Sequence, residues 1–160
     1  MRGLHGILAA AAAIAATAVL AGCGGECYEN QNALPQATFV INDSAPHTGS
    51  MDSLTVYGIG APNDSMLWDG GSTEQLFIPF RVDSDTTAYV FESSPSHIRD
   101  TVTFIYDRAP VFVSADCGVS FKFVMKSISN TGQLIDSVTC PNGEITNQNI
   151  ANLVIYLRHE

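Results

Sequence analysis

The strongest constraint on the fold is a period-two alternation of apolar and polar side chains in residues 119–126. Every odd position of this segment is apolar, and the even positions are polar except Val124. Such alternation predicts a β-strand with one buried face, because successive side chains of a strand point to opposite faces. Shorter segments of strand-like composition recur between clusters of turn residues. The expected strands are 38–41, 54–57, 76–82, 87–91, 102–106, 111–113, 119–125, 135–140 and 153–157.

These strands predict an all-β domain, because the sequence shows no apolar stripe of helical period and length. We expect an immunoglobulin-like β-sandwich of about seven to nine strands, with a small β-barrel as the alternative. Pro79 lies inside the 76–82 run and indicates an edge strand or a bulge, since proline has no backbone N–H. The segment 58–75 is rich in Gly, Asn, Asp and Ser, so we expect a long loop or a broken strand pair there.

The N-terminus has the pattern of an export signal. Arg2 precedes an alanine-rich apolar run that ends in Leu20-Ala21-Gly22-Cys23. That string resembles the bacterial lipobox, which is cut just before a diacylglyceryl-modified cysteine. We therefore expect residues 1–22 to be a lipoprotein signal peptide, with Cys23 the lipid-anchored first residue. The alternative is an ordinary signal peptide with a chance cysteine at this position.

The expected domain organisation follows from that cleavage point. Residues 23–35 form the anchor and a tether, and residues 36–160 form one β-sandwich domain. No aspartate follows Cys23 directly, so the enterobacterial signal for retention in the inner membrane is missing. We expect the protein in the cell envelope, anchored in the outer membrane and facing the periplasm.

The charge of the chain excludes one class of partner. After removal of the signal peptide, six basic and 16 acidic side chains remain, a formal charge of −10. Such an acidic surface repels phosphate backbones and anionic headgroups. We expect no binding to nucleic acid, and no attachment to a membrane through a basic patch.

Three cysteines remain once Cys23 is lipidated, which allows one disulfide and one free thiol. We favour a Cys27–Cys117 bridge between the tether and a turn deep in the domain. It would enclose 90 positions, worth about 4 kcal/mol in the chain-entropy model. The alternative, Cys117–Cys140, would staple two neighbouring strands. Cys140 ends an apolar run and could instead be a buried free thiol.

The sequence offers no constellation of catalytic or cofactor-binding residues. His47, His97 and His159 lie in turn-like or terminal segments without ligand spacing, so we interpret them as surface residues. Residues 83–87 begin like a calcium loop, but Ala88 and Ser94 occupy the positions that need glycine and an acid. We interpret this segment as a turn. We therefore expect a non-enzyme with no metal and no cofactor.

Trp68 is the one tryptophan and precedes two glycines. It could stack on a sugar or another ligand, or fold back and cap the sandwich, where burial of a large aromatic side chain is a strong stabiliser. Capping is the interpretation we favour.

Aspartate is followed six times by Ser or Thr and then by an apolar residue or Thr. This resembles the acceptor motif for O-glycosylation in exported Bacteroides-type proteins, although Asp-Ser is also a common end of a turn. The candidate acceptors are Ser44, Ser53, Ser65, Thr86, Thr101 and Ser137. We predict a glycan on at least one of them.

Several segments resemble those of small Bacteroides-type lipoproteins of unknown function. The similarity spans most of residues 27–157 and rests on Cys27, Pro35 and the segments 38–41, 76–80, 100–106 and 113–118. The resemblance implies an export signal, a β-sandwich and a cysteine pair matching Cys27 and Cys117, with Cys140 as the odd thiol. The family has no assigned activity, so the resemblance supplies no catalytic residues.

The sequence thus predicts a membrane-anchored envelope lipoprotein that acts as a non-catalytic interaction or structural module. It would be attached to the membrane through its N-terminal lipid and would bind an envelope protein. The alternative is a module that binds a glycan or small ligand through the Trp68 loop. A hydrolase with scattered acidic residues is a third possibility.

Overall fold

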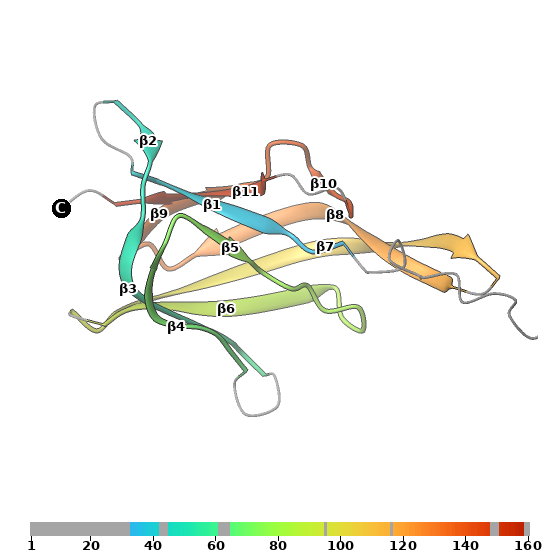
Figure 1. The fold of residues 1–160 in the computed structure, drawn as a ribbon, viewed down its shortest axis with the longest axis horizontal. Helices are drawn as coiled ribbons and strands as arrows, with labels where there is room; N and C mark the ends of the chain where they lie inside the picture. The colour runs from blue at the N-terminus through green and yellow to red at the C-terminus, as the bar shows by residue number, and fades with distance from the viewer. Residues whose placement is uncertain are drawn as a thin grey trace, which may run out of the picture.

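The structure, a computed structural model, is built of β-strands (Figure 1). It describes residues 33–41, 45–60, 65–94, 96–115, 117–147 and 151–158. Within these ranges, no helix is long and apolar enough to cross a membrane. The strands are β1 (Gln36–Ile41), β2 (His47–Thr48), β3 (Met51–Gly58), β4 (Met66–Thr73), β5 (Gln75–Phe77), β6 (Thr86–Ser93), β7 (Ile98–Ser114), β8 (Gly118–Asn130), β9 (Ile135–Thr139), β10 (Glu144–Ile145) and β11 (Ala151–Leu157).

The strands form two sheets that pack as a sandwich. The first has the order β2-β1-β11-β9, with β5 also paired to β1, and the second has the order β10-β8-β7-β6-β3-β4. The sheets are not closed into a barrel, so the prediction of an all-β sandwich is confirmed and the barrel alternative is wrong. The first sheet contains one parallel pair, β1 with β11, so the first and last strands of the domain lie side by side.

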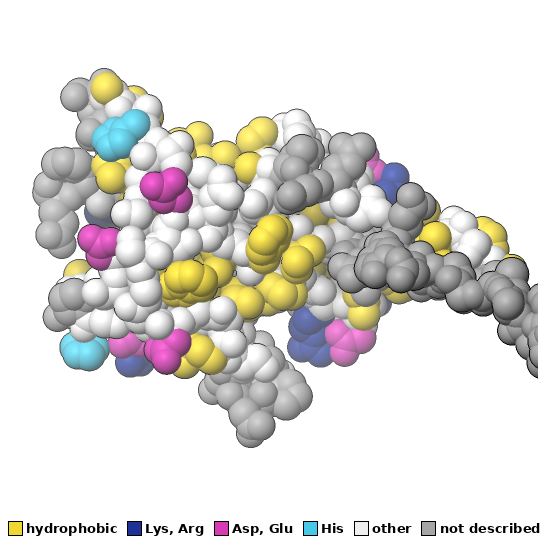
Figure 2. Space-filling view, viewed as in Figure 1, with side chains coloured by type: hydrophobic (Ala, Val, Ile, Leu, Met, Phe, Trp, Pro, Cys, Tyr) yellow, Lys and Arg dark blue, Asp and Glu magenta, His cyan; other side chains and the backbone are white. Residues whose placement is uncertain are grey.

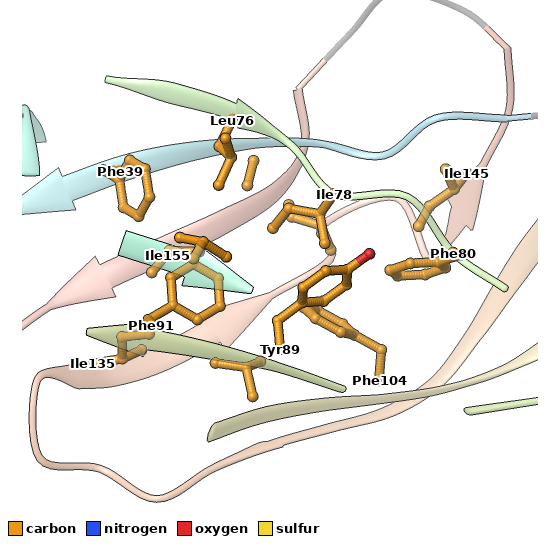
Figure 3. Packing of buried hydrophobic residues seen from close by; sticks show 14 of the residues in the cluster. Phe39, Leu76, Ile78, Phe80, Tyr89, Phe91, Phe104, Ile135, Ile145 and Ile155 are labelled. Carbon is orange, nitrogen blue, oxygen red and sulfur yellow. The ribbon is translucent and has the colours of Figure 1, made fainter. Parts of the chain in front are cut away.

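The core lies between the two sheets and is built from alternate residues of the facing strands. Figure 3 shows Phe39 and Ile155 of one sheet pointing toward Phe91 and Phe104 of the other. All four of these side chains are fully buried. Burial of this apolar surface is the main term that stabilises the sandwich.

An aromatic cluster closes the core at the end where β7 and β8 leave the sandwich. Phe80 stacks on Tyr106 with ring centroids 4.5 Å apart, and it meets Phe123 edge-on at 5.4 Å. Phe80 comes from the segment that crosses from β5 to β6, so this segment is fixed by its side chains rather than by a sheet.

The crossing segment differs from the prediction of one strand over 76–82. Leu76, Ile78 and Phe80 do alternate into the core, but the strand stops at Phe77. Pro79 has no N–H to continue a ladder, and the chain leaves the sheet there. Val82, which the alternation placed on the same face, is exposed.

Two other segments are more regular than the sequence indicated. Within 58–75, β4 pairs with β3 through several register shifts, which is the broken strand pair rather than the long loop. The two short strands expected at 102–106 and 111–113 belong to one continuous strand, the 17-residue β7.

Candidate functional site

The distinctive feature of the molecule is the long hairpin formed by β7 and β8, which extends past the ends of both sheets (Figure 1). β6 pairs with β7 only as far as Ile105, and β10 pairs with β8 only at Phe123 and Val124. Beyond these positions the two strands pair with each other, Arg108 with Phe123 and Phe112 with Val119. We call residues 109–114 and 118–121 the arm. At about 3.4 Å per residue, it reaches roughly 20 Å beyond Arg108.

The arm is apolar and exposed. Phe112 and Val119 lie opposite each other across the ribbon and are 70% and 52% exposed, and Val111 beside them is 40% exposed. In Figure 2, hydrophobic side chains are visible at the end of the molecule where the hairpin projects. Monomeric proteins rarely leave neighbouring large apolar side chains in water unless they bind something there.

A hollow of about 370 Å³ lies at the base of the arm. Val111 and Phe121 contribute to its wall from the hairpin, and Thr146 and Asn147 contribute from the segment after β10. The hollow therefore continues the apolar surface of the arm toward the body of the sandwich.

Charged side chains gather where the arm joins the sandwich. From 109 to 121 the sequence has a single charged residue, Asp116, although acidic side chains are frequent elsewhere. At the base, three cations of the hairpin each pair with an acid, and we call these three pairs the charged collar. The pairs are Arg108 Nε with Asp85 Oδ1 at 2.8 Å, Lys122 Nζ with Glu144 Oε1 at 2.5 Å, and Lys126 Nζ with Asp107 Oδ2 at 2.6 Å.

The N-terminal segment of the domain is attached to the same hairpin. The backbone N–H of Ala33 donates to the carbonyl oxygen of Phe121 at 2.8 Å, and Ala33 is buried. The described chain therefore begins beside Phe121, at an edge of β8 that β10 does not cover.

Cys117 and Cys140, the two cysteines among the described residues, differ in their bonding state. Cys117 lies in the turn that joins β7 to β8, and it is not a free thiol. This turn is the tip of a projecting hairpin, whereas the sequence analysis had placed it within the body of the domain. Among the described residues Cys140 is free, and burial raises the pKa of its thiol. Cys23 and Cys27 lie outside the described residues.

The most strongly held polar group is Asp100, which is fully buried within β7. Its carboxylate accepts hydrogen bonds from the hydroxyl of Thr131 and from the backbone N–H groups of Gln133, Leu134 and Ile135. Burial alone raises the pKa of Asp100, but these hydrogen bonds outweigh it, so the pKa lies below the ordinary value. Asp100 fixes the turn between β8 and β9 and has a structural role.

Trp68 lies on β4, half-buried against the core. Its indole N–H donates to the carbonyl oxygen of Gly71, three residues further on, at 3.2 Å. The ring lies against Gly71, so that a Cβ at this position would come within 3.1 Å of the indole. The ring thus folds back against the core, as in the capping interpretation of Trp68, and its N–H is satisfied within β4.

The candidate glycosylation sites differ in accessibility. Ser65 and Thr86 are exposed, and each lies at or beside the start of a strand. The other three described positions, Ser53, Thr101 and Ser137, are half-buried. Ser44 lies outside the described residues.

The histidines and the calcium-like segment have the positions expected of surface residues and a turn. His47 and His97 are exposed, and His97 lies 3.2 Å from Glu92. His159 is outside the described ranges.

In the 83–87 turn, Ser84 Oγ accepts the N–H of Thr86, while Asp83 pairs with Arg81. Across the described part of the chain, no three acidic, histidine or cysteine side chains come close enough together to hold a metal ion.

Sequence reasoning missed the arm as a site. The signal was present, because residues 109–121 lack charge except at Asp116 while both flanks carry a cation. The signal was concealed because the expected strands ended at 106 and began again at 111, which divided the hairpin strand in two.

Comparison with known proteins gives a family without a function. Residues 53–157 match the profile of DUF6452, described as a family of unknown function. The match runs from within β3 to the end of β11 and includes the whole long hairpin. No curated protein and no solved structure matches the chain significantly.

Proposed function

Because the chain belongs to DUF6452, a family of unknown function, we propose its role from its own geometry. We propose that it is a lipid-anchored protein of the bacterial cell envelope, of the Bacteroides-type lipoprotein kind. Its sandwich is a non-catalytic interaction module and its arm is the contact surface. Signal peptidase cleavage before Cys23 and lipidation of that residue provide the membrane attachment.

The observation that carries this proposal is the exposed apolar arm. A sandwich of this size is stabilised by its own core, which ends at Tyr106 and Phe123 among the described hairpin residues. Phe121 at the base of the arm still packs against that core, but Val111, Phe112 and Val119 further out expose apolar surface to solvent, which lowers solubility and adds little to the stability of the domain. A binding role explains why the arm carries these exposed apolar side chains.

We propose that a Cys27–Cys117 disulfide ties the tether to the tip of the arm. Two thiols lose two protons and two electrons to a disulfide-bearing oxidase of the envelope, and one S–S bond forms. The proposal is supported by the free state of Cys140 and by the bonded state of Cys117. It agrees with the entry of Ala33 beside Phe121.

The second function considered from the sequence, ligand binding by Trp68, has weaker support. The indole N–H is used by Gly71, and the ring is packed against its own strand. A stacking platform for a sugar needs an aromatic face that is open to solvent. We therefore place the contact surface on the arm.

The experiment that tests the proposed function is carried out on the full-length chain expressed in its native envelope. We expect the mature protein to sediment with membranes and to carry the mass of a diacylglyceryl group and its N-terminal acyl chain on Cys23. Cys23→Ser should be released from the membrane fraction, and Cys140→Ser should stay in it. Equal fractionation of Cys23→Ser and the wild-type chain would show that the lipid anchor is not the attachment.

A further inference from the structure

We propose that the partner of the arm is the lipid bilayer itself, so that the hairpin rests with its tip in the membrane that holds the anchor. This inference rests on the proposed lipidation of Cys23 and on the Cys27–Cys117 bridge. It specifies what the apolar surface contacts. The partner is an uncharged or zwitterionic glycerophospholipid bilayer, and the apolar side chains of the arm insert into its acyl region.

The first argument is distance along the chain. Cys23 precedes Ala33 by ten residues, and an extended chain of that length reaches at most about 35 Å. The proposed bridge also limits the distance between Cys23 and the hairpin turn. Cys27 is four residues from Cys23, a reach of about 14 Å, and a disulfide adds about 6 Å between Cα atoms, so a Cys27–Cys117 bond would hold the hairpin turn within roughly 20 Å of the lipidated residue.

The second argument is the order of apolar and charged groups along the hairpin. Phe112 and Val119 lie next to the turn and are both more than half exposed, and Asp116 is the one charge that follows Phe112 and precedes Val119 in the sequence. The charged collar lies further back, at the junction with the sandwich. A segment that lies at a membrane surface buries its apolar side chains about 5–10 Å into the boundary between headgroups and acyl chains and keeps its charged side chains on the water side.

The third argument is the lack of a basic cluster on the arm. Each cation of the charged collar is paired with an acid of the same chain, and Asp116 is the one charge between residues 109 and 121. Attraction to anionic headgroups therefore contributes little. Contact should depend on apolar burial, and it should be insensitive to salt.

The test uses the lipidated full-length protein in vesicles of phosphatidylcholine, with tryptophan as the probe. Phe112→Trp places an indole on the arm. Phe77→Trp is the matched control, because Phe77 is also an exposed phenylalanine, 45% accessible, but lies on β5. Trp68 is common to both variants and to the wild-type chain, whose emission is subtracted.

We expect phosphatidylcholine brominated on its acyl chains to quench at least half of the added emission of Phe112→Trp and to leave that of Phe77→Trp unchanged. The Phe112→Trp emission should also shift to shorter wavelength on vesicles, equally at low and high salt. Val119→Trp, on the facing strand, should behave like Phe112→Trp and serves if the first variant does not fold.

The possible results separate this inference from the proposed function. Arm tryptophans that stay unquenched on vesicle-bound protein overturn the inference and leave the anchor intact. A blue shift without bromine quenching also overturns it, because the arm is then covered by protein such as a second copy. If the chain carries no lipid, the anchor proposal fails. Quenching on added vesicles then still supports membrane contact by the arm, and its absence overturns it.

Discussion

The carboxylate of Asp100 accepts a hydrogen bond from the backbone N–H of Ile135, thirty-five residues further along the chain, at 2.6 Å. Together with Leu134 and Gln133, this bond means that one buried side chain holds three consecutive amides of the turn between β8 and β9. This turn positions β9 for its pairing with β11. Asp100, on β7 of one sheet, therefore helps to fix the position of β9 in the other sheet.

We predict that Asp100→Asn destabilises the domain by about 2–4 kcal/mol. The amide directs an NH₂ group at donors that need an acceptor, and buried unsatisfied N–H groups are costly. Urea unfolding measures the loss. Asp69→Asn is the control, because Asp69 is exposed on β4 and should change stability by less than about 0.5 kcal/mol.

The same carboxylate gives the domain a defined acid sensitivity. Its pKa is lowered in the folded state, so its contribution is present above the ordinary value of 3.8 and is lost as pH falls through the lower folded pKa. We expect the stability difference between wild type and Asp100→Asn to narrow in that acid range. A difference that stays constant from neutral pH to pH 2 would contradict the assignment.

Gly71 and Gly70 provide a matched pair for the packing of Trp68. Gly71→Ala places a methyl group 3.1 Å from the indole, so the ring must move and its bond to the Gly71 carbonyl weakens. Gly70→Ala meets no atom within 4 Å but has a φ of +68°, which strains any residue with a Cβ. We expect both to lose about 1 kcal/mol. Only Gly71→Ala should shift the tryptophan emission to longer wavelength.

Tyr89 is predicted to resist ionisation. Burial raises its pKa to about 12, and its hydroxyl donates to the carbonyl oxygen of Pro79 at 2.5 Å. The stability contributed by the neutral phenol is complete below the unfolded value near 10 and is lost as pH rises through the folded value. Burial also raises the pKa of Tyr106, so absorbance titration at 295 nm should show a late step whose amplitude Tyr89→Phe reduces. Ionisation of every tyrosine near pH 10 in the folded protein would refute the prediction of a raised pKa for Tyr89.

Cys140 should be the one thiol that alkylates in the unreduced, folded protein. The proposed Cys27–Cys117 bond and the lipid on Cys23 protect the other three cysteines. Burial raises the pKa of Cys140, so its reaction with iodoacetamide at neutral pH should be slower than that of glutathione and should accelerate as pH rises above 9. Intact mass should show one added group, and none for Cys140→Ser. Two added groups before reduction would argue against the bridge.

The accessible candidate acceptors narrow the glycosylation hypothesis. Ser65 and Thr86 are exposed, so we expect a glycan on one or both in the native host. The intact mass of native protein should fall by one glycan in Ser65→Ala or Thr86→Ala. A native mass equal to that of the chain plus its lipid would reject the hypothesis for all six positions.

Local sequence pattern predicted the sheets well where one face of a strand is buried throughout. Val102, Phe104 and Tyr106 do point into the core. The alternation over 119–125 became the first half of β8, but of its apolar face only Phe123 is fully buried, and Val119 on the arm is exposed. The expected gap between 106 and 111 was wrong, because β7 runs through it, and Pro110 is tolerated there since β6 does not pair with β7 beyond Ile105.

Non-local contacts explain the other failures. Asp100 looked like the end of a turn, yet its partners are backbone amides more than 30 residues away. Trp68 could not be placed from its neighbours alone, because its contact with Gly71 depends on how β4 bends against β3. The exposure of the arm could not be predicted, because it depends on where β6 and β10 stop pairing with the hairpin. The local sequence pattern does not show how far two strands pair.

The parallel pairing of β1 with β11 has a consequence for how the chain acquires its structure. β11 lies between β1 and β9, and Gln36 is in register with Ala151. Contacts between segments so distant in sequence form slowly, and here β11 is synthesised after the other described strands of its sheet. A chain cut before Ala151 leaves the edge of β1 and the side chain of Phe39 without their cover. A polypeptide that lacks β11 would therefore expose the unpaired edges of β1 and β9, which can pair with other chains and aggregate.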